Sequence, residues 1–298
     1  MKKYIISSVL LIVAATVTGQ QLHTSSLYDL QGVVNNAAMA GIHQNDFIGF
    51  TYRSQWSGIA GSPKTASVFG TFDLPKPGMG IGANIYSDKT GPTSHTGVQI
   101  NLAKYFIMKN NARLSLGLET RFQQYAIDKA QLLASLGSDP VLGSADSKFK
   151  YDAGFGVAYA TEKFEVGASV SQLVQSKLDF YTGNLKRSEE AKLYRHYYFH
   201  GAYHWDVDGV TTITPNFLTI YLPNAPTEFQ VGARVEHNKI FWWGLGYRSR
   251  QSYMISAGFN IDKKFTIGYA YDDYVNPIST FDGGSGGHEF ILRYNFVK

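Results

Sequence analysis

The feature that most constrains this chain is a two-residue alternation of apolar with polar or small side chains, which recurs along most of its length. Tyr253, Ile255, Ala257, Phe259 and Ile261 occupy alternate positions, and Ser, Gly and Asn predominate between them. Successive side chains of a β-strand point to opposite faces, so this period indicates strands with one apolar face. A surface helix would show a period near 3.6 residues instead. The sequence therefore predicts an all-β protein.

About fourteen segments carry this alternation. We place them at residues 46–56, 64–73, 78–87, 93–106, 112–126, 149–161, 163–173, 194–205, 210–221, 227–236, 240–248, 252–261, 264–273 and 287–297. Tight turns alternate with long or polar connections at residues 127–148, 174–193 and 274–286. Outer-membrane barrels combine short periplasmic turns with longer outer loops and an even strand number. We therefore predict a single transmembrane antiparallel β-barrel of about fourteen strands at residues 46–298.

One segment, residues 210–221, follows the pattern least well. Pro215 interrupts it, and the apolar parity shifts from Ile213 and Phe217 to Leu218. Proline cannot donate a hydrogen bond to a neighbouring strand and is found at edges or bulges. We therefore predict a β-bulge at this position.

The composition agrees with a membrane barrel and excludes several other classes of protein. Aromatic residues reach 14% and charged residues only 17%, with 30 glycines and no cysteine. The missing cysteine excludes disulfides, thiol nucleophiles, cysteine-ligated zinc, iron–sulfur clusters and a lipoprotein anchor. A net charge of +4 is too balanced to indicate a nucleic-acid partner. A mean hydropathy of −0.17 excludes a bundle of membrane helices.

The N-terminus is typical of an export signal. Two lysines precede an apolar run from Ile5 to Val17, which is followed by small residues. This run is shorter than the roughly 20 residues of a spanning helix. We therefore expect a cleaved signal peptide at residues 1–19 and export of the rest. Residues 20–45 carry no alternation, and we expect them to enter the lumen as a plug or to cover the periplasmic mouth.

Strand parity also assigns polar side chains to the lumen. On the first strand Tyr52 and Ser54 share one face, whereas Arg53 and Gln55 share the other, which can point inward. The same reasoning places further side chains inside: Gln99, Asn101, Glu119, Arg121, Gln123, Glu228, Gln230, Arg234, Glu236 and Arg248. Their mixed charge favours a plugged or salt-bridged lumen over an ion filter of a single sign.

Some local patterns resemble sites of chemistry but have a structural explanation. His196, His200 and His204 have the spacing of ligands on a helix, yet residues four apart on a strand stand about 13 Å from each other. We interpret them as a row facing the lumen, and Asp206-Val207-Asp208-Gly209 as a hairpin turn. Gly-x-Gly pairs fall inside strands, where small residues relieve crowding; they are Gly78/Gly80/Gly82, Gly154/Gly156 and Gly244/Gly246. We expect no catalytic residue, metal site or cofactor.

Several short motifs follow one another in the chain. They are Asn35-Asn36-Ala37-Ala38-Met39-Ala40-Gly41, Tyr52-Arg53-Ser54-Gln55-Trp56, Gly61-Ser62-Pro63-Lys64-Thr65, Asp88-Lys89-Thr90-Gly91-Pro92, Gly244-x-Gly246-Tyr247-Arg248, Gly268-Tyr269-Ala270-Tyr271-Asp272 and Gly287-His288-Glu289-Phe290. In this order they resemble the PorP/SprF family, outer-membrane proteins of the type IX secretion and gliding machinery of Bacteroidota. The first motif has Ala37 where the family pattern has proline.

The resemblance implies a non-enzymatic role at the outer membrane. It implies pairing with exported cargo that carries a C-terminal secretion domain, including surface adhesins, or a link between the translocation apparatus and the membrane. The implied partners are outer-membrane lipid, such cargo, type IX secretion subunits and a periplasmic peptidoglycan-binding protein. The candidate partner or lumen contacts are Arg53, Gln55, Asp88, Glu119, Arg121, Arg234, Arg248, His288 and Glu289.

Two other functions remain open from the sequence. A passive or substrate-specific pore for small solutes predicts an open lumen, with a conductance that changes when Arg121 or Arg234 is neutralised. A barrel hydrolase, with a serine and a histidine brought together by the strands, predicts turnover of phospholipid or ester substrates.

Overall fold

A computed structural model describes residues 24–128, 130–131, 146–178, 192–223, 225–275 and 286–296. The predicted signal peptide lies outside these residues. In the part of the chain that the structure describes, no helix has the length and apolar character needed to cross a membrane.

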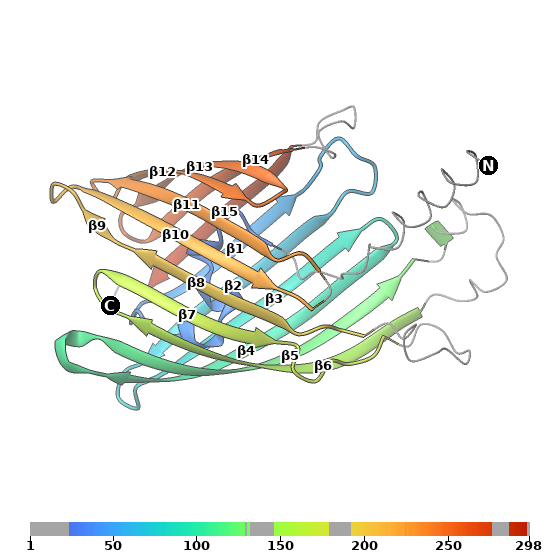
Figure 1. Ribbon diagram of the computed structural model, residues 1–298, viewed down its shortest axis with the longest axis horizontal. Helices are drawn as coiled ribbons and strands as arrows, with labels where there is room; N and C mark the ends of the chain where they lie inside the picture. Colours follow the sequence, from blue (N-terminus) through green and yellow to red (C-terminus); the bar gives the residue numbers. More distant parts are fainter. Residues whose placement is uncertain are drawn as a thin grey trace, which may run out of the picture.

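Antiparallel strands form one closed sheet (Figure 1). They are β1 (Asp46–Ser54), β2 (Lys64–Leu74), β3 (Met79–Thr90), β4 (Thr93–Ile107), β5 (Arg113–Ile127), β6 (Asp146–Ala160), β7 (Phe164–Ser171), β8 (His196–Tyr203), β9 (Trp205–Asp206), β10 (Thr211–Tyr221), β11 (Glu228–His237), β12 (Phe241–Arg248), β13 (Ser252–Ile261), β14 (Phe265–Tyr274) and β15 (Gly287–Phe296). Each pairs with its neighbour in sequence, and β1 pairs with β15 to close the barrel. β8 and β9 pair with successive parts of the same edge of β10, so together they occupy one strand position. The fifteen strands therefore form a fourteen-strand wall. The predicted fourteen-strand barrel is confirmed.

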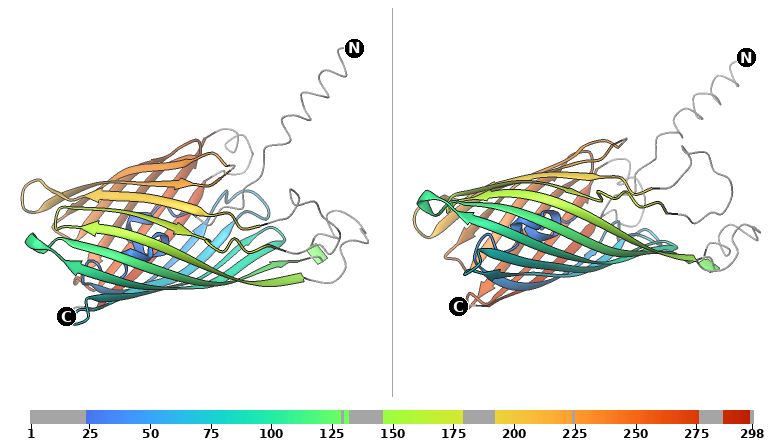
Figure 2. Two further views of the ribbon diagram at one scale, coloured as in Figure 1. Left: turned by 60° about the horizontal axis from the view of Figure 1, so that its bottom comes forward. Right: turned by 90° about the horizontal axis from the view of Figure 1, so that it is seen from below.

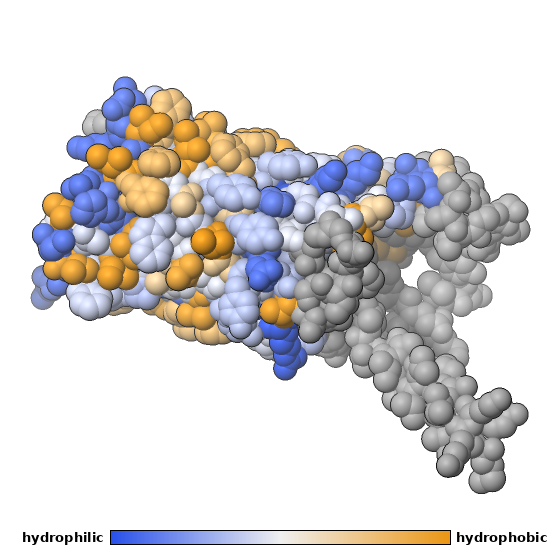
Figure 3. All heavy atoms as spheres, turned by 90° about the horizontal axis from the view of Figure 1, so that it is seen from above, coloured by the Kyte–Doolittle hydropathy of each residue, from blue (hydrophilic) through white to orange (hydrophobic). Residues whose placement is uncertain are grey.

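The two faces of the wall match the predicted alternation. On β1, Ile48 and Phe50 are 43% and 38% exposed, whereas Thr51 and Arg53, which have the opposite parity, are buried. The same contrast recurs on the other strands, so the outer surface carries a band of apolar side chains. Figure 3 shows this band on one side of the barrel, with strongly hydrophilic residues mainly towards its two ends. This distribution suits a wall in contact with lipid.

The connections β2–β3, β4–β5, β6–β7, β11–β12 and β13–β14 are all short and lie together at one end of the barrel (Figure 1). Three of them have two successive residues with positive φ, as in the type I′ turns of hairpins; they are Asn110-Asn111, Asn238-Lys239 and Asp262-Lys263. At Asp206–Gly209, the Asp208 carboxylate accepts hydrogen bonds from the backbone N–H groups of Thr211 and Val210, which lower its pKa. This end is periplasmic by the usual pattern of such barrels. The opposite end, which has the longer connections and also the short ones at residues 91–92 and 249–251, is the outer end.

The predicted β-bulge at Pro215 is wrong. β10 keeps one register along β11, where Thr214, Pro215 and Asn216 face consecutive residues. On its other side the pairing lapses at Pro215 and resumes beyond it in the same register, which is why β8 and β9 are separate. The parity shift has a different cause. Leu218 and Ile220 are buried on the inner face, so here the lumen itself is apolar.

Candidate functional site: the lumen and the segment inside it

Residues 24–45, which we call the lumenal segment, run inside the ring of strands before β1 (Figure 2). The segment forms three short turns: η2 (Tyr28–Leu30), α2 (Gly32–Asn35) and η3 (Ala37–Met39). Too short to be stable alone, these turns depend on contacts with the wall. The segment meets the wall in four ways: an ionic cluster, hydrogen bonds to its backbone, a floor of glycines and apolar anchors.

The ionic cluster lies towards the outer end of the lumen. Arg53 on β1 forms ion pairs with Glu289 on β15, 2.9 Å away, and with Asp272 on β14. Ser25 donates to Glu289 at 2.5 Å, and the Ser26 hydroxyl donates to Asp272 at 2.7 Å. The three charged side chains are at most 4% exposed. The cluster therefore joins two wall strands to β1 and fixes the start of the lumenal segment.

Arg248 and further contacts of Ser26 complete this cluster. The Ser26 backbone N–H donates to Glu289 at 2.7 Å, and the Arg53 guanidinium donates to the Ser26 hydroxyl at 2.7 Å. Arg248 on β12 donates to the same hydroxyl at 3.2 Å, and its Nη1 lies 3.7 Å from Asp272. Such multiple hydrogen bonds compensate the large cost of removing these charges from water.

Wall side chains also satisfy the backbone carbonyls of α2. A helix leaves its last carbonyls without partners of its own. Here Asn101 donates to the Val33 carbonyl at 2.8 Å, Gln99 to the Val34 carbonyl at 3.2 Å, and Ser169 to the Asn35 carbonyl at 2.6 Å. These donors come from β4 and β7, so α2 is held across the lumen.

Arg121 supports those donors from β5. Its Nε donates to Glu119 at 3.0 Å, and its Nη2 donates to Gln99 at 3.1 Å. Glu119 in turn accepts from Gln99 at 3.1 Å and from Ser171 at 3.1 Å. All of these side chains are buried, and the pair orients the amide that holds α2.

Glycines let the backbone of η3 approach the wall directly. A Cβ at Gly80 would stand 2.1 Å from the Ala40 carbonyl oxygen, and one at Gly117 would stand 2.2 Å from the Ala38 nitrogen. A Cβ at Gly156 would stand 2.0 Å from Asn36 Oδ1. No larger residue fits at these distances, so the glycines form a floor that matches this stretch of the segment. The prediction that such glycines relieve crowding inside the barrel agrees with these contacts.

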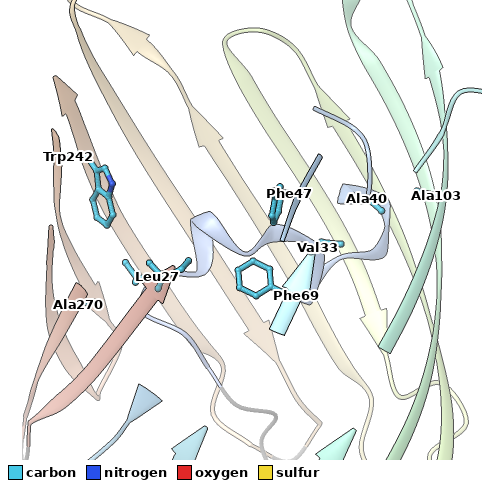
Figure 4. Close-up of a cluster of buried hydrophobic side chains, with 9 residues drawn as sticks. Leu27, Val33, Ala40, Phe47, Phe69, Ala103, Trp242 and Ala270 are labelled. Atoms are coloured by element: carbon cyan, nitrogen blue, oxygen red, sulfur yellow. The ribbon is translucent and has the colours of Figure 1, made fainter. Parts of the chain in front are cut away.

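Apolar anchors complete the seating of the segment. Leu27 and Val33 belong to a buried cluster with Phe47, Phe69 and Trp242 (Figure 4). Tyr28 packs in a second cluster with Tyr198, with Leu218 and Ile220 on the inner face of β10, and with Leu222 directly after this strand. The Tyr28 hydroxyl donates to Asn216 at 2.5 Å. The apolar patch in the lumen is therefore covered by Tyr28 of the lumenal segment.

The last residues of the segment are tied down at the periplasmic end. Arg113 donates to the Ile42 carbonyl at 2.9 Å and to the Gln44 side chain at 2.6 Å. His43 Nε2 lies 2.7 Å from the Glu165 carboxylate on β7. The segment therefore contacts wall strands from one end of its described length to the other.

The structure brings most of the predicted candidate residues into this lumen. Every side chain assigned to the lumen by parity lies on the inner face, and most are buried. Five of the candidates, Arg53, Glu289, Glu119, Arg121 and Arg248, belong to the two networks above. Arg234 forms an ion pair with Asp29 of the segment. Gln55 donates to Tyr274 at 3.1 Å near the outer end.

Two candidates lie apart from the lumenal networks. Asp88 accepts a hydrogen bond from the Thr65 hydroxyl at 2.5 Å, near the outer end of the paired strands β2 and β3. His288 contacts Tyr269, whose side chain is 47% exposed on the outer face, and so lies on the opposite face from Glu289. His196 and His200 are buried in the lumen, and His200 lies 3.0 Å from Asn36. Among the described residues, no three His, Cys, Asp or Glu side chains are grouped to hold a metal ion.

Sequence reasoning missed the residues of the segment that bind the wall. Ser25, Ser26 and Asn36 carry its hydrogen bonds, but an irregular segment has no period from which their directions could be derived. Asp272 was also missed as a partner of Arg53, although its position in β14 has inward parity. Its parity was a usable signal, because Tyr271 and Asp272 must face opposite sides of the wall.

Adding a methyl group to the glycine floor should loosen the segment without breaking the wall. Gly117→Ala places its Cβ against the backbone of η3, and we expect a loss of about 1–3 kcal/mol in the free energy of unfolding, typical of overpacking. The control is Gly246→Ala, whose Cβ would meet chiefly the flexible end of Met254 at 2.7 Å. Denaturant unfolding in detergent micelles measures both. Equal stability of the two variants would contradict a tightly seated segment.

Together the closed sheet, apolar exterior and polar lumen define the class of protein, an outer-membrane β-barrel whose lumen holds a segment of its own chain. A family model described as type IX secretion system membrane protein PorP/SprF matches residues 17–294. The chain belongs to this family, and the resemblance drawn from its motifs is confirmed.

Solved structures with the same fold are outer-membrane barrels. The toluene transporter TbuX of Ralstonia pickettii superposes with a TM-score of 0.50 at 10% identity, over 89% of this chain and 92% of that chain. The outer membrane protein Omp33 of Acinetobacter baumannii gives 0.48 at 8% identity, over 85% and 99%. At 10% identity the likeness to TbuX shows the fold alone. A comparison with curated proteins gives no match.

Proposed function

We propose that this protein is a closed, non-enzymatic barrel that anchors an exported protein of the type IX secretion system, or assists its export, at the outer membrane. In this proposal residues 1–19 direct export and are removed, and the lumenal segment is a permanent plug. The cargo carries a C-terminal secretion domain, as a surface adhesin would. Other secretion subunits and a peptidoglycan-binding protein are the partners on the periplasmic side.

The observation that carries the proposal is the use of the lumenal polar groups. In a pore, the inward-facing charges and amides line the path of the solute. Here Arg53, Glu289, Gln99 and Asn101 instead bind the lumenal segment or the side chains that hold it. Because the inward-facing polar groups bind the lumenal segment, the structure favours a closed anchoring barrel over a pore for solutes. Membership of the PorP/SprF family supports a place in secretion.

The outer end offers a surface for such a partner. The first part of β6, residues 146–154, pairs only with β5 among the described strands, because β7 joins β6 from Phe155 onwards. This hairpin extends at the outer end of the wall (Figure 2). Phe149 on it is 76% exposed, the largest value among the exposed large apolar side chains described. Exposed aromatic side chains of this kind are frequent anchors of protein interfaces.

The proposal is tested by isolating the tagged protein from its native outer membrane in mild detergent and identifying co-purified proteins by mass spectrometry. We expect a large exported protein with a C-terminal secretion domain, or secretion subunits. Phe149→Ser should reduce this recovery by about fivefold or more, as loss of an interface anchor does. The matched control, Phe106→Ser, changes an exposed phenylalanine at the periplasmic end of β4. Recovery of the barrel alone from the unaltered strain would refute the anchoring role.

A further inference from the structure

Two adjoining cavities lie in the periplasmic half of the lumen, on the side of the lumenal segment away from the ionic cluster. Their volumes are about 310 Å³ and about 360 Å³. Both are lined by Arg234 of β11 and Arg293 of β15, and the second reaches Lys239 and Lys263 in two of the periplasmic turns. We call this combined space the basic vestibule. The lining also includes three carboxylates, those of Asp29, Glu165 and Glu236.

Arg293 is the arginine of this space that has no carboxylate partner among the described residues. Its guanidinium carbon lies 3.7 Å from the centre of the Phe47 ring, and its Nε donates to Asn295 at 2.7 Å. Within the described residues, no carboxylate forms an ion pair with it. The aromatic ring fixes the plane of the guanidinium, so its two terminal nitrogens are held in one orientation beside the cavity.

Arg234 is held in the same manner, but its charge is already matched. It lies 5.1 Å from the centre of the Trp242 ring and forms an ion pair with Asp29 of the segment. This pair places a carboxylate beside an arginine in the first cavity. Two other acids line these cavities. Glu165 lies 2.7 Å from His43 Nε2, and Glu236 accepts a hydrogen bond from Asn260 at 2.9 Å.

We propose that the basic vestibule binds a carboxylate ligand supplied from the periplasm, with Arg293 as its principal contact. A planar guanidinium matches the two oxygens of a carboxylate with parallel hydrogen bonds. Lys239 and Lys263 at the rim attract the anion towards the opening. The carboxylate comes either from a free small acid or from an acidic side chain of a periplasmic protein segment, and the two sources share this chemistry.

The test is calorimetric titration of the full-length barrel in detergent micelles at low salt. One arm uses succinate and the other a capped tripeptide of glutamate. We expect saturable binding of at least one probe, and a loss of affinity of about tenfold or more in Arg293→Gln, because a charge-assisted pair is removed. Binding of succinate identifies a free acid as sufficient, whereas binding of the peptide alone identifies a protein segment. The control is Lys76→Gln, which removes one charge from the β2–β3 turn at the same end.

A second variant tests the proposal through a gain. Glu236→Gln keeps an acceptor for Asn260 but removes a negative charge from the cavity wall, so we expect affinity to rise about threefold, as relief of a nearby like charge predicts. Absence of saturable binding of both probes by the folded wild type would overturn the proposal. So would an affinity unchanged by both Arg293→Gln and Glu236→Gln.

Discussion

A barrel that lacks residues 24–42 is expected to conduct ions in planar bilayers, whereas the full-length protein is expected to stay closed. The deletion removes the part of the lumenal segment that crosses the interior, and leaves all the strands of the wall. Somewhat larger barrels, of 16–18 strands, enclose an aqueous channel when nothing fills them. We expect the current through single barrels to rise by at least about tenfold. Single-channel recording measures it directly.

The control for this experiment must show that the shortened chain still forms its wall. Folded barrels that resist detergent migrate faster on a gel before heating than after it, so both proteins should show this shift. If the full-length protein conducts as well as the shortened one, the plug proposal is wrong and the pore that the sequence left open becomes the better explanation. Neutralising Arg121 or Arg234 would then be the next change to record.

The wall was predictable from sequence because the alternation within each strand shows which side chains face the lipid and which face the lumen. On β13, apolar residues at odd positions and small or polar residues at even ones give the boundary and both faces, and the predicted range of 252–261 equals the observed strand. The turns add a second signal, since residue pairs such as Asp262-Lys263 bring neighbouring strands directly together. Even the ion pair between Arg53 and Glu289 follows once β1 and β15 close the barrel, because the two residues are cross-strand neighbours.

The contents of the lumen were not predictable in the same manner. The turns of the lumenal segment are three or four residues long, and none has a period of its own. The position of Asn36 depends on space left at Gly156, about 120 residues further along the chain, and that of Ala38 on space left at Gly117, about 80 residues further along. The parity shift near Leu218 was visible in the sequence, but its cause, contact with Tyr28, was not. The sequence analysis attributed the parity shift to a bulge at Pro215 because the contact between Leu218 and Tyr28 could not be seen in the sequence.

Removal of Arg53 is expected to be the most destabilising single change in the lumen. Arg53→Met leaves Asp272 and Glu289 buried without their main counter-charge, and breaking a buried pair in this manner costs about 3–5 kcal/mol. It also removes the donor to Ser26, so the start of the lumenal segment should loosen as well. Denaturant unfolding followed by tryptophan fluorescence in lipid vesicles measures the free energy of unfolding.

Two comparison variants separate the ionic cost from loss of size. The triple variant Arg53→Met, Asp272→Asn, Glu289→Gln keeps the volume but removes all three charges, and we expect it to recover most of the loss, because the penalty comes from uncompensated carboxylates. Arg195→Met changes an exposed arginine before β8 and should alter stability by less than about 0.5 kcal/mol. If the triple variant is as unstable as Arg53→Met, packing around the arginine rather than its charge holds this part of the lumen. The cluster would then have no special role in fixing the start of the plug.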